Sequence, residues 1–178
     1  IHPPSIVNAL HQTENVMKKV LLTLSLIVCF AAAMYGQSEY KSAIGLRFGA
    51  PTSISYKTFI SDPGAIELYA GFRGWDGYSW FAVGGMYQHH MQFPDVPGLK
   101  WYFGGGASVY FWNFDDNFNN DDAGNTSFGI NGVLGLDYKF SGAPVNLSID
   151  WMPTVFLNGY GNGFGGGYGA FSARYTFK

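Results

Sequence analysis

Apolar and polar residues alternate along the chain from residue 40 onward, in eight runs separated by clusters of glycine, proline, asparagine and aspartate. The runs cover residues 41–49, 53–60, 65–73, 78–90, 99–112, 127–140, 145–155 and 165–177. A period of two is typical of β-strands, because successive side chains point to opposite faces of the sheet. Several runs have the ~9–11 residues that a tilted strand needs to cross a bilayer. The pattern predicts an all-β chain of eight antiparallel strands.

One face of these runs is apolar and aromatic, whereas the other face carries the charges. Seven basic and three acidic residues fall on the polar face: Lys41, Arg47, Lys57, Arg73, Lys100, Lys139 and Arg174, with Glu67, Asp137 and Asp150. A soluble sandwich would carry such charges on its outside. The length and aromatic content of the apolar face instead predict an inverted barrel, with lipid outside and charges within. Because eight strands enclose a space only just wide enough for side chains, we expect the ten residues to form a salt-bridged network, positively biased, that plugs the lumen.

Aromatic residues gather toward both ends of the apolar face. Tyr40, Tyr87, Trp101, Tyr138 and Tyr175 lie near one end of the runs, and Phe48, Phe81, Phe111, Phe128 and Trp151 lie near the other. Such girdles are typical of the two membrane interfaces. The turns at residues 61–64, 94–98 and 141–144 are short, whereas the connections at 113–126 and 156–165 are longer. In transmembrane barrels the short turns are periplasmic and the long loops external.

The composition agrees with a barrel and excludes other classes. Hydrophobic residues make up 47% of the chain and charged residues 12%, about half of the ~25% usual in soluble domains. A mean hydropathy near zero excludes a bundle of transmembrane helices. The formal net charge of −2 gives no reason to expect nucleic acid as a partner.

The first 36 residues have the pattern of a targeting segment rather than of a fold. Met17, Lys18 and Lys19 form a basic region, residues 20–30 are apolar, and three alanines follow at 31–33. We therefore expect an upstream extension at 1–16, a helical signal peptide at 17–36 and the barrel at 37–178. The single cysteine, Cys29, falls in the signal peptide, so the exported chain needs no disulfide. The bulky Val28 before it disfavours lipidation.

The end of the chain resembles a known assembly signal. Residues 171–178 (FSARYTFK) alternate apolar residues and close on an aromatic, as does the C-terminal β-signal of bacterial barrels. With GLRFGAPTSISYK (45–57) and SIDWMP (148–153), the chain resembles small porin-like outer-membrane β-barrel proteins of OmpX/OmpA-type size, in particular those of Bacteroidota. The resemblance implies an eight-stranded antiparallel up-and-down transmembrane β-barrel in the outer membrane of a Gram-negative bacterium. It also implies outer-membrane lipid as surroundings and the barrel-assembly machinery as a partner that reads Phe171, Tyr175 and Phe177.

The sequence offers little for catalysis or metal binding. His89 and His90 end the fourth run beside a turn, where we expect solvated interface residues, and no serine nearby suggests a nucleophile. The acidic loop at 115–122 begins like a calcium loop but lacks the glycine and the final glutamate of one. We therefore expect no catalytic residues, no metal and no cofactor.

The longer loops carry aromatic residues that could contact an unidentified protein partner: Phe114, Phe118, Tyr160 and Phe164. The sequence thus favours a small integral barrel, plugged by salt bridges, with a structural or loop-mediated interaction role. The alternative is a narrow anion-favouring pore. A lipid-modifying barrel enzyme and a secreted lipocalin-like carrier are less favoured.

Overall fold

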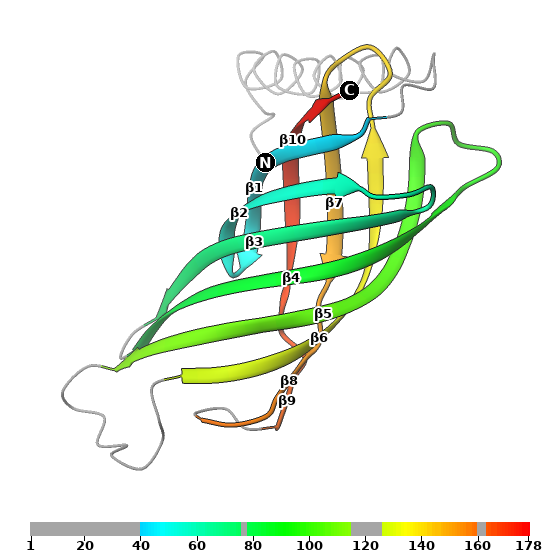
Figure 1. Cartoon of the computed structure of the whole chain (residues 1–178). Helices are drawn as coiled ribbons and strands as arrows, with labels where there is room; N and C mark the ends of the chain where they lie inside the picture. The colour runs from blue at the N-terminus through cyan, green and yellow to red at the C-terminus, as the bar shows by residue number, and fades with distance from the viewer. Residues whose placement is uncertain (1–39, 76–77, 115–125, 160–162) are drawn as a thin grey trace, which may run out of the picture. The chain divides into compact units, whose positions relative to one another are not determined.

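The computed structural model of the chain describes residues 40–75, 78–114, 126–159 and 163–178. These residues form β-strands and turns (Figure 1). In chain order the strands are β1 (Ser42–Ala50), β2 (Thr52–Phe59), β3 (Gly64–Trp75), β4 (Tyr78–Gln92), β5 (Leu99–Phe114), β6 (Thr126–Lys139), β7 (Val145–Trp151), β8 (Thr154–Phe156), β9 (Gly163–Gly165) and β10 (Gly169–Phe177). Within the described ranges, no helix has the length and apolarity needed to cross a membrane. The expected signal peptide and the extension before it lie outside the described residues.

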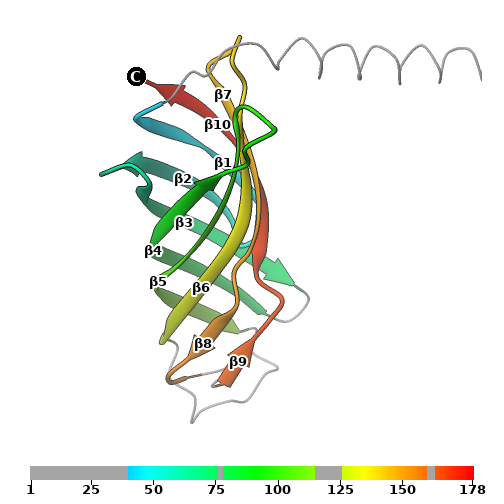
Figure 2. The same ribbon diagram turned by 90° about the vertical axis from the view of Figure 1, so that its right-hand side faces the viewer.

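The strands close into an antiparallel barrel with eight strand positions (Figures 1 and 2). Strands β1 to β6 each pair with the next strand in the chain, β7 pairs with β10, and β10 returns to β1. β8 prolongs the seventh position beside β6, and β9 pairs with β8. Because every position has two neighbours, the prediction of an all-β, eight-stranded antiparallel barrel is confirmed.

Two of the predicted runs are interrupted. β7 ends at Trp151 and β8 begins at Thr154, because Pro153 between them has no N–H to donate to the ladder. The amide of Met152 instead donates to the carbonyl of Tyr168 at 2.9 Å, and Gly132 N donates to Pro153 O at 2.8 Å. β9 and β10 are likewise separate strands, so the prediction of unbroken strands at 145–155 and 165–177 is wrong at these points.

Three short connections and the C-terminus lie at the same end of the barrel, which we call the turn end. The connections are residues 60–63, 93–98 and 140–144. The amide of Lys41 donates to Phe177 O at 2.9 Å, so the start of the described chain lies at this end too. The opposite end, at which β1, β3, β5 and β8 end, is the loop end.

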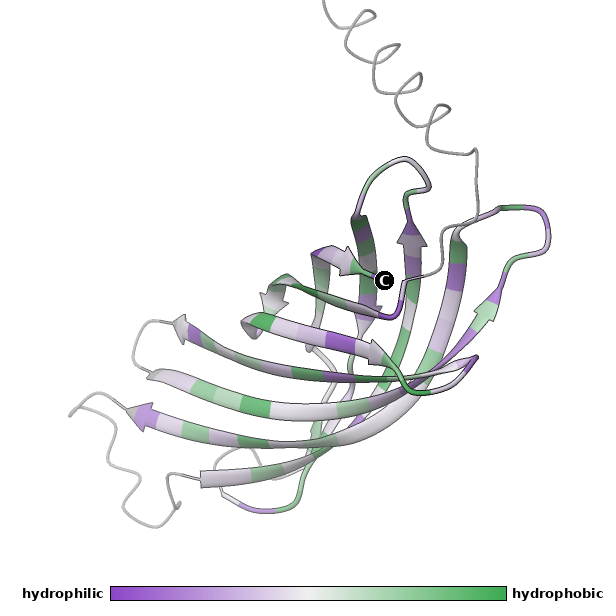
Figure 3. Ribbon diagram, turned by 45° about the horizontal axis from the view of Figure 1, so that its top comes forward, coloured by the Kyte–Doolittle hydropathy of each residue, from purple (hydrophilic) through white to green (hydrophobic). Residues whose placement is uncertain are grey.

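Side chains alternate between the inside and the outside of the wall, and the usual distribution of polarity is inverted. Leu46, Phe72 and Ile149 point outward and are 51%, 66% and 57% exposed. Their neighbours Arg47 and Asp150 point inward and are 1% and 7% exposed. Figure 3 shows this alternation as hydrophobic and hydrophilic segments that follow one another along the strands. The barrel therefore buries charges in its lumen and presents apolar residues around its wall.

Candidate functional site

Six charged side chains meet inside the turn-end half of the barrel and form what we call the charged layer. They are Arg47 (β1), Lys57 (β2), Glu67 (β3), Asp137 (β6), Asp150 (β7) and Arg174 (β10). Each is at most 7% exposed. A buried charge is costly unless it is paired and hydrogen-bonded, so the contacts among these six decide whether the lumen is stable.

Arg47 and Arg174 are held by two carboxylates. Arg47 donates to Asp150 through both terminal nitrogens, at 2.8 and 3.1 Å, and to Glu67 at 3.0 Å. Arg174 donates to the same oxygen of Glu67, and its Nη1 reaches Ser148 at 2.7 Å. The second oxygen of Glu67 accepts from the side chain of Gln88. Two-nitrogen contacts of this kind are among the strongest hydrogen bonds in proteins and fix the orientation of the guanidinium.

Lys57 and Asp137 form a second pair, closer to the turn end. Lys57 Nζ lies 2.6 Å from Asp137 Oδ2 and 4.7 Å from the centre of the Tyr102 ring. Asp137 also accepts from Asn146 at 2.7 Å. Gln88 adds a further contact to the arginine group, since its Nε2 donates to Glu67 Oε2 at 2.7 Å. The charges are thus satisfied from several strands at once.

The strand register leaves room for these long side chains. Arg47 lies opposite Ser53 on β2 and Ser172 on β10, and Arg174 lies opposite Gly45 on β1. Because these cross-strand neighbours are small, they leave space inside the lumen beside the two arginines. Each guanidinium can therefore reach across the lumen.

The charged layer is balanced, with three bases against three acids. The prediction of a positively biased interior is therefore wrong for the buried part of the lumen. The other four predicted members, Lys41, Arg73, Lys100 and Lys139, share the inward parity but are not buried. They lie near strand ends, where alternation still points them inward but the barrel opens to solvent.

A second group of inward side chains fills the loop-end half, and sequence reasoning missed it. Trp80, Tyr110, Trp112, Phe156 and Tyr168 pack on one another, with Trp80 centred 5.1 Å from Tyr110 and 5.8 Å from Trp112. We call this group the aromatic layer. Trp112 Nε1 donates to Ser127 at 2.9 Å, so its polar atom is satisfied. The lumen is thus filled by two chemically different layers, one ionic and one aromatic.

Glycines make room for the tyrosines between the two layers. Tyr69 pairs across strands with Gly84, and Tyr102 pairs with Gly135. A Cβ atom at Gly84 would lie 2.5 Å from the Tyr69 ring, and one at Gly135 would lie 2.6 Å from the Tyr102 ring. Each ring therefore lies flat over a bare stretch of neighbouring backbone. Tyr102 also donates to Asp150 at 2.9 Å, which links it to the charged layer.

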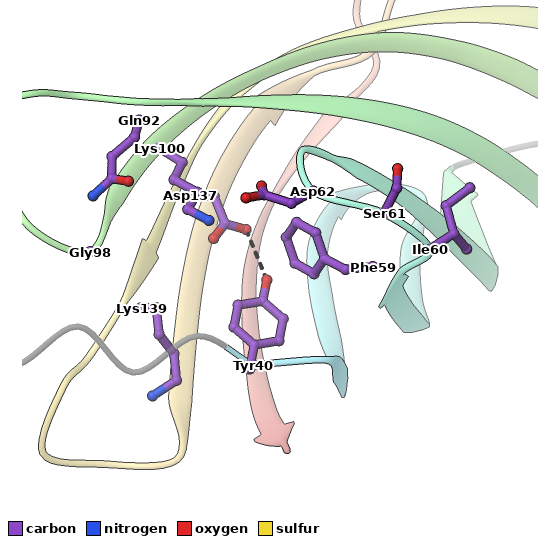
Figure 4. Close-up of a pocket in the computed structure, with 10 residues that line it drawn as sticks. All are labelled: Tyr40, Phe59, Ile60, Ser61, Asp62, Gln92, Gly98, Lys100, Asp137 and Lys139. Atoms are coloured by element: carbon purple, nitrogen blue, oxygen red, sulfur yellow. Dashed lines mark hydrogen bonds between the residues drawn. The ribbon is translucent and has the colours of Figure 1, made fainter.

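A cavity of about 200 Å³ opens at the turn end, and we call it the mouth cavity. Figure 4 shows the residues around it: Tyr40, Phe59, Ile60, Ser61, Asp62, Gln92, Gly98, Lys100, Asp137 and Lys139. Lys139 donates to the carbonyl oxygens of Phe140 and Ala143, which holds the adjacent turn. The cavity is the approach from the turn end to the Lys57–Asp137 pair.

Tyr40 belongs to this cavity rather than to the outer girdle. Its hydroxyl donates to Asp137 Oδ2 at 3.5 Å, and its ring meets Phe59 edge-on at 5.2 Å. Burial and the charge of Asp137 raise the pKa of the Tyr40 hydroxyl well above its usual value, so the phenol keeps its proton. The prediction of Tyr40 on the apolar face is wrong, because this residue precedes β1 and does not follow the strand's alternation.

The two histidines have different environments. His89 points outward and packs against Phe103, with ring centres 5.4 Å apart. His90 points inward and is only 3% exposed, between Phe59 and Tyr102. The prediction of two solvated interface histidines is therefore wrong for His90. The reason is that β4 continues to Gln92, so His90 still lies inside the wall.

The residues predicted for partner contact and assembly fall partly within the described ranges. Phe164 on β9 is 71% exposed. Phe118 and Tyr160 lie outside the described residues, as does the side chain of Phe114. Phe171, Tyr175 and Phe177 follow one another on the outer face of β10, where they are 46%, 54% and 43% exposed.

The chemistry available in this lumen is ionic and aromatic packing. In the part of the chain that the structure describes, no group of three or more histidine, cysteine or acidic side chains could hold a metal ion. The acids of the charged layer are engaged by bases and amides. Such an arrangement stabilises the barrel and obstructs its centre.

Comparisons with known proteins do not assign the chain to a family. No family model matches it, and neither a curated protein nor a solved structure matches at a significant level.

Proposed function

We propose that the chain is a small integral outer-membrane β-barrel with a lumen closed by its own side chains, in a structural or loop-mediated interaction role. The observation that carries the proposal is the outer wall. Twenty-eight large hydrophobic side chains of the described residues are exposed, and all but Ile60 and Leu157 lie on the outward face of a strand. Soluble monomers rarely expose contiguous apolar patches larger than about a few hundred Å². Exposure of this apolar wall is favourable in lipid and unfavourable in water.

The reverse distribution disfavours a secreted lipocalin-like carrier. Such a barrel would need an apolar lumen and a polar wall. Here the lumen contains Arg47, Glu67 and Arg174, each at most 2% exposed. These charges also argue for a filled centre, because the two layers occupy both halves of the lumen. We therefore favour a barrel that does not conduct over the narrow anion-favouring pore.

Fractionation tests the membrane proposal. Expressed with its own leader in a Gram-negative host, the protein should stay in the washed outer-membrane pellet and leave it only with detergent. Unboiled samples should migrate differently from boiled samples on a denaturing gel. A closed barrel, in which each strand is hydrogen-bonded to a neighbour on both sides, stays folded in the detergent until it is heated. Recovery in the detergent-free supernatant would overturn the proposal.

Planar-bilayer recording separates the closed barrel from the pore. We expect no steady conductance from the purified protein at neutral pH. Steady anion-selective openings, absent from matched detergent controls, would favour the pore.

The interaction role can be tested at the loop end. Photoreactive benzoylphenylalanine in place of Phe164 should cross-link to protein in intact cells at reproducible masses. The same group in place of Phe171, which points outward on β10, should cross-link to lipid or not at all. Identical protein adducts at both positions would argue against a role specific to the loop end.

A further inference from the structure

The imidazole of His90 is buried in a way that leaves its polar atoms unused. Its ring centre lies 4.9 Å from that of Phe59 and 5.0 Å from that of Tyr102, and the ring is 3% exposed. Neither ring nitrogen has a hydrogen-bond partner among the described residues. A neutral imidazole carries one donor and one acceptor, and buried groups of this kind are normally paired. The neutral ring is therefore held mainly by its aromatic contacts.

The charges that face His90 disfavour a proton on it. Lys57 from β2 lies over the same Tyr102 ring at 4.7 Å, and Lys100 from β5 lies over Phe59 at 5.4 Å. Asp137 from β6 faces the cluster too, but it already pairs with Lys57 at 2.6 Å. A protonated His90 would add a cation beside the ammonium groups of Lys57 and Lys100. Like charges brought together in a low-dielectric site repel strongly.

Phe59 connects His90 to the mouth cavity. Its ring lines the cavity, meets Tyr40 edge-on at 5.2 Å on one side and contacts His90 on the other. If the imidazole leaves its place, Phe59 loses the packing that keeps it between the cavity and the charged layer. A change in the charge of His90 is therefore coupled by direct contact to the closure of the mouth.

We propose that His90 is an acid-operated latch on the mouth cavity: proton uptake drives the imidazole out from between Phe59 and Tyr102 and opens the charged layer to the turn end. The aromatic layer, which contains none of these charges, stays closed, so the device admits water and small solutes to the ionic half of the lumen without making a continuous pore. The latch depends on the barrel and on the cluster around His90, and it stands apart from the membrane proposal.

His89 provides a matched control. It is the same residue type on the same strand, but it faces outward and packs on Phe103 at 5.4 Å. Replacing it should not affect the lumen. Acid effects that belong to histidine in general, or to β4 as a whole, would appear at both positions.

A buried cysteine can report the opening. Ser172 is fully buried, lies opposite Arg47 in the charged layer, and its hydroxyl makes no hydrogen bond among the described residues. Ser172→Cys, in a Cys29→Ala background, would react with the small neutral reagent methyl methanethiosulfonate when the layer opens. At each pH we take the ratio of two labelling rates: that of the reporter with His90 intact, divided by that of the same reporter carrying His90→Phe. The effect of pH on the ionisation of the thiol is the same in both proteins and cancels in this ratio.

The ratio should be close to one near pH 8. A solvated imidazole takes up its proton near pH 6.5, so below about that pH the ratio should rise by up to about tenfold per pH unit, the limit for one coupled proton. His89→Phe should leave this rise unchanged. If His90→Phe does not fold, His90→Gln, which cannot titrate, replaces it.

Three results would overturn the latch. The ratio could stay flat between about pH 8 and about pH 4.5. His89→Phe could abolish the rise as well. The heat-modifiable gel band could vanish over the same pH range as labelling begins, which would mean that the whole barrel unfolds.

Discussion

Removing the charge of Glu67 should destabilise the barrel more than any conservative change at its surface. Glu67 is fully buried and accepts from Arg47 at 3.0 Å, from Arg174, and from Gln88 at 2.7 Å. Glu67→Gln keeps the shape of the side chain but removes the carboxylate that Arg174 contacts and leaves Arg47 with Asp150 alone. Removing one partner of a buried ion pair costs about 3–5 kcal/mol, because an uncompensated charge stays behind. We expect a loss of this size in the free energy of unfolding.

Urea unfolding in lipid vesicles, followed by tryptophan fluorescence, measures this loss. Asp95→Asn, at an exposed carboxylate in the 93–98 turn, is the matched control and should change stability by less than about 0.5 kcal/mol. The double variant Glu67→Gln with Arg174→Gln restores the charge balance and should recover about 1–3 kcal/mol of the loss. A loss below about 1 kcal/mol for Glu67→Gln, or no recovery in the double variant, would refute the reasoning, since both follow from an unpaired buried cation.

The remaining predictions concern the glycines, the salt dependence and the outer wall. Gly135→Ala places a Cβ 2.6 Å from the Tyr102 ring and should cost about 1–3 kcal/mol in the same unfolding assay, whereas Gly142→Ala, with open space around it, should cost less than about 0.5 kcal/mol; equal effects would contradict the packing. The urea midpoint should be nearly the same in about 0.05 M and about 1 M sodium chloride, because salt screens exposed charges and not buried ones; a large decrease would mean that the charged layer is open to solvent. Ile149→Lys, at a side chain 57% exposed on β7, should cost about 2–4 kcal/mol in vesicles if the wall faces lipid; a neutral result would indicate water.

Alternation along the chain was sufficient to predict which face the residues within the central strands take. Lys57, Glu67 and Asp137 were expected to point inward, and they do, because parity along a strand is fixed once its centre is known. Parity does not show, however, how far from the end of the barrel an inward residue lies. Four bases with inward parity lie near strand ends and are not buried, and this is why the buried charges are balanced rather than positive: Lys41, Arg73, Lys100 and Lys139.

Contacts between distant strands could not be predicted in the same way. Arg47 and Asp150 are 103 residues apart, and their pairing depends on the closure of β10 onto β1 and β7. The aromatic layer was missed for the same reason. Trp80 and Tyr110 both point inward, but only the strand register shows that they meet.

His90 was missed because of a strand end. Its parity matches that of Gln88, which is inward and fully buried, so the signal was present. The predicted strand stopped at residue 90, and a histidine at a strand end beside a turn is expected to be solvated. The extension of β4 to Gln92 changes that expectation.

Quenching of single tryptophans by lipids with brominated acyl chains tests the account most directly. Trp151 is outward and 50% exposed, whereas Trp80 is inward and 4% exposed. In variants that keep one of these tryptophans and replace the others by phenylalanine, reconstituted into vesicles, the account predicts strong quenching of Trp151 and little quenching of Trp80. Equal quenching of both, or quenching of Trp80 alone, would contradict a barrel whose apolar wall faces lipid and whose lumen is closed to it.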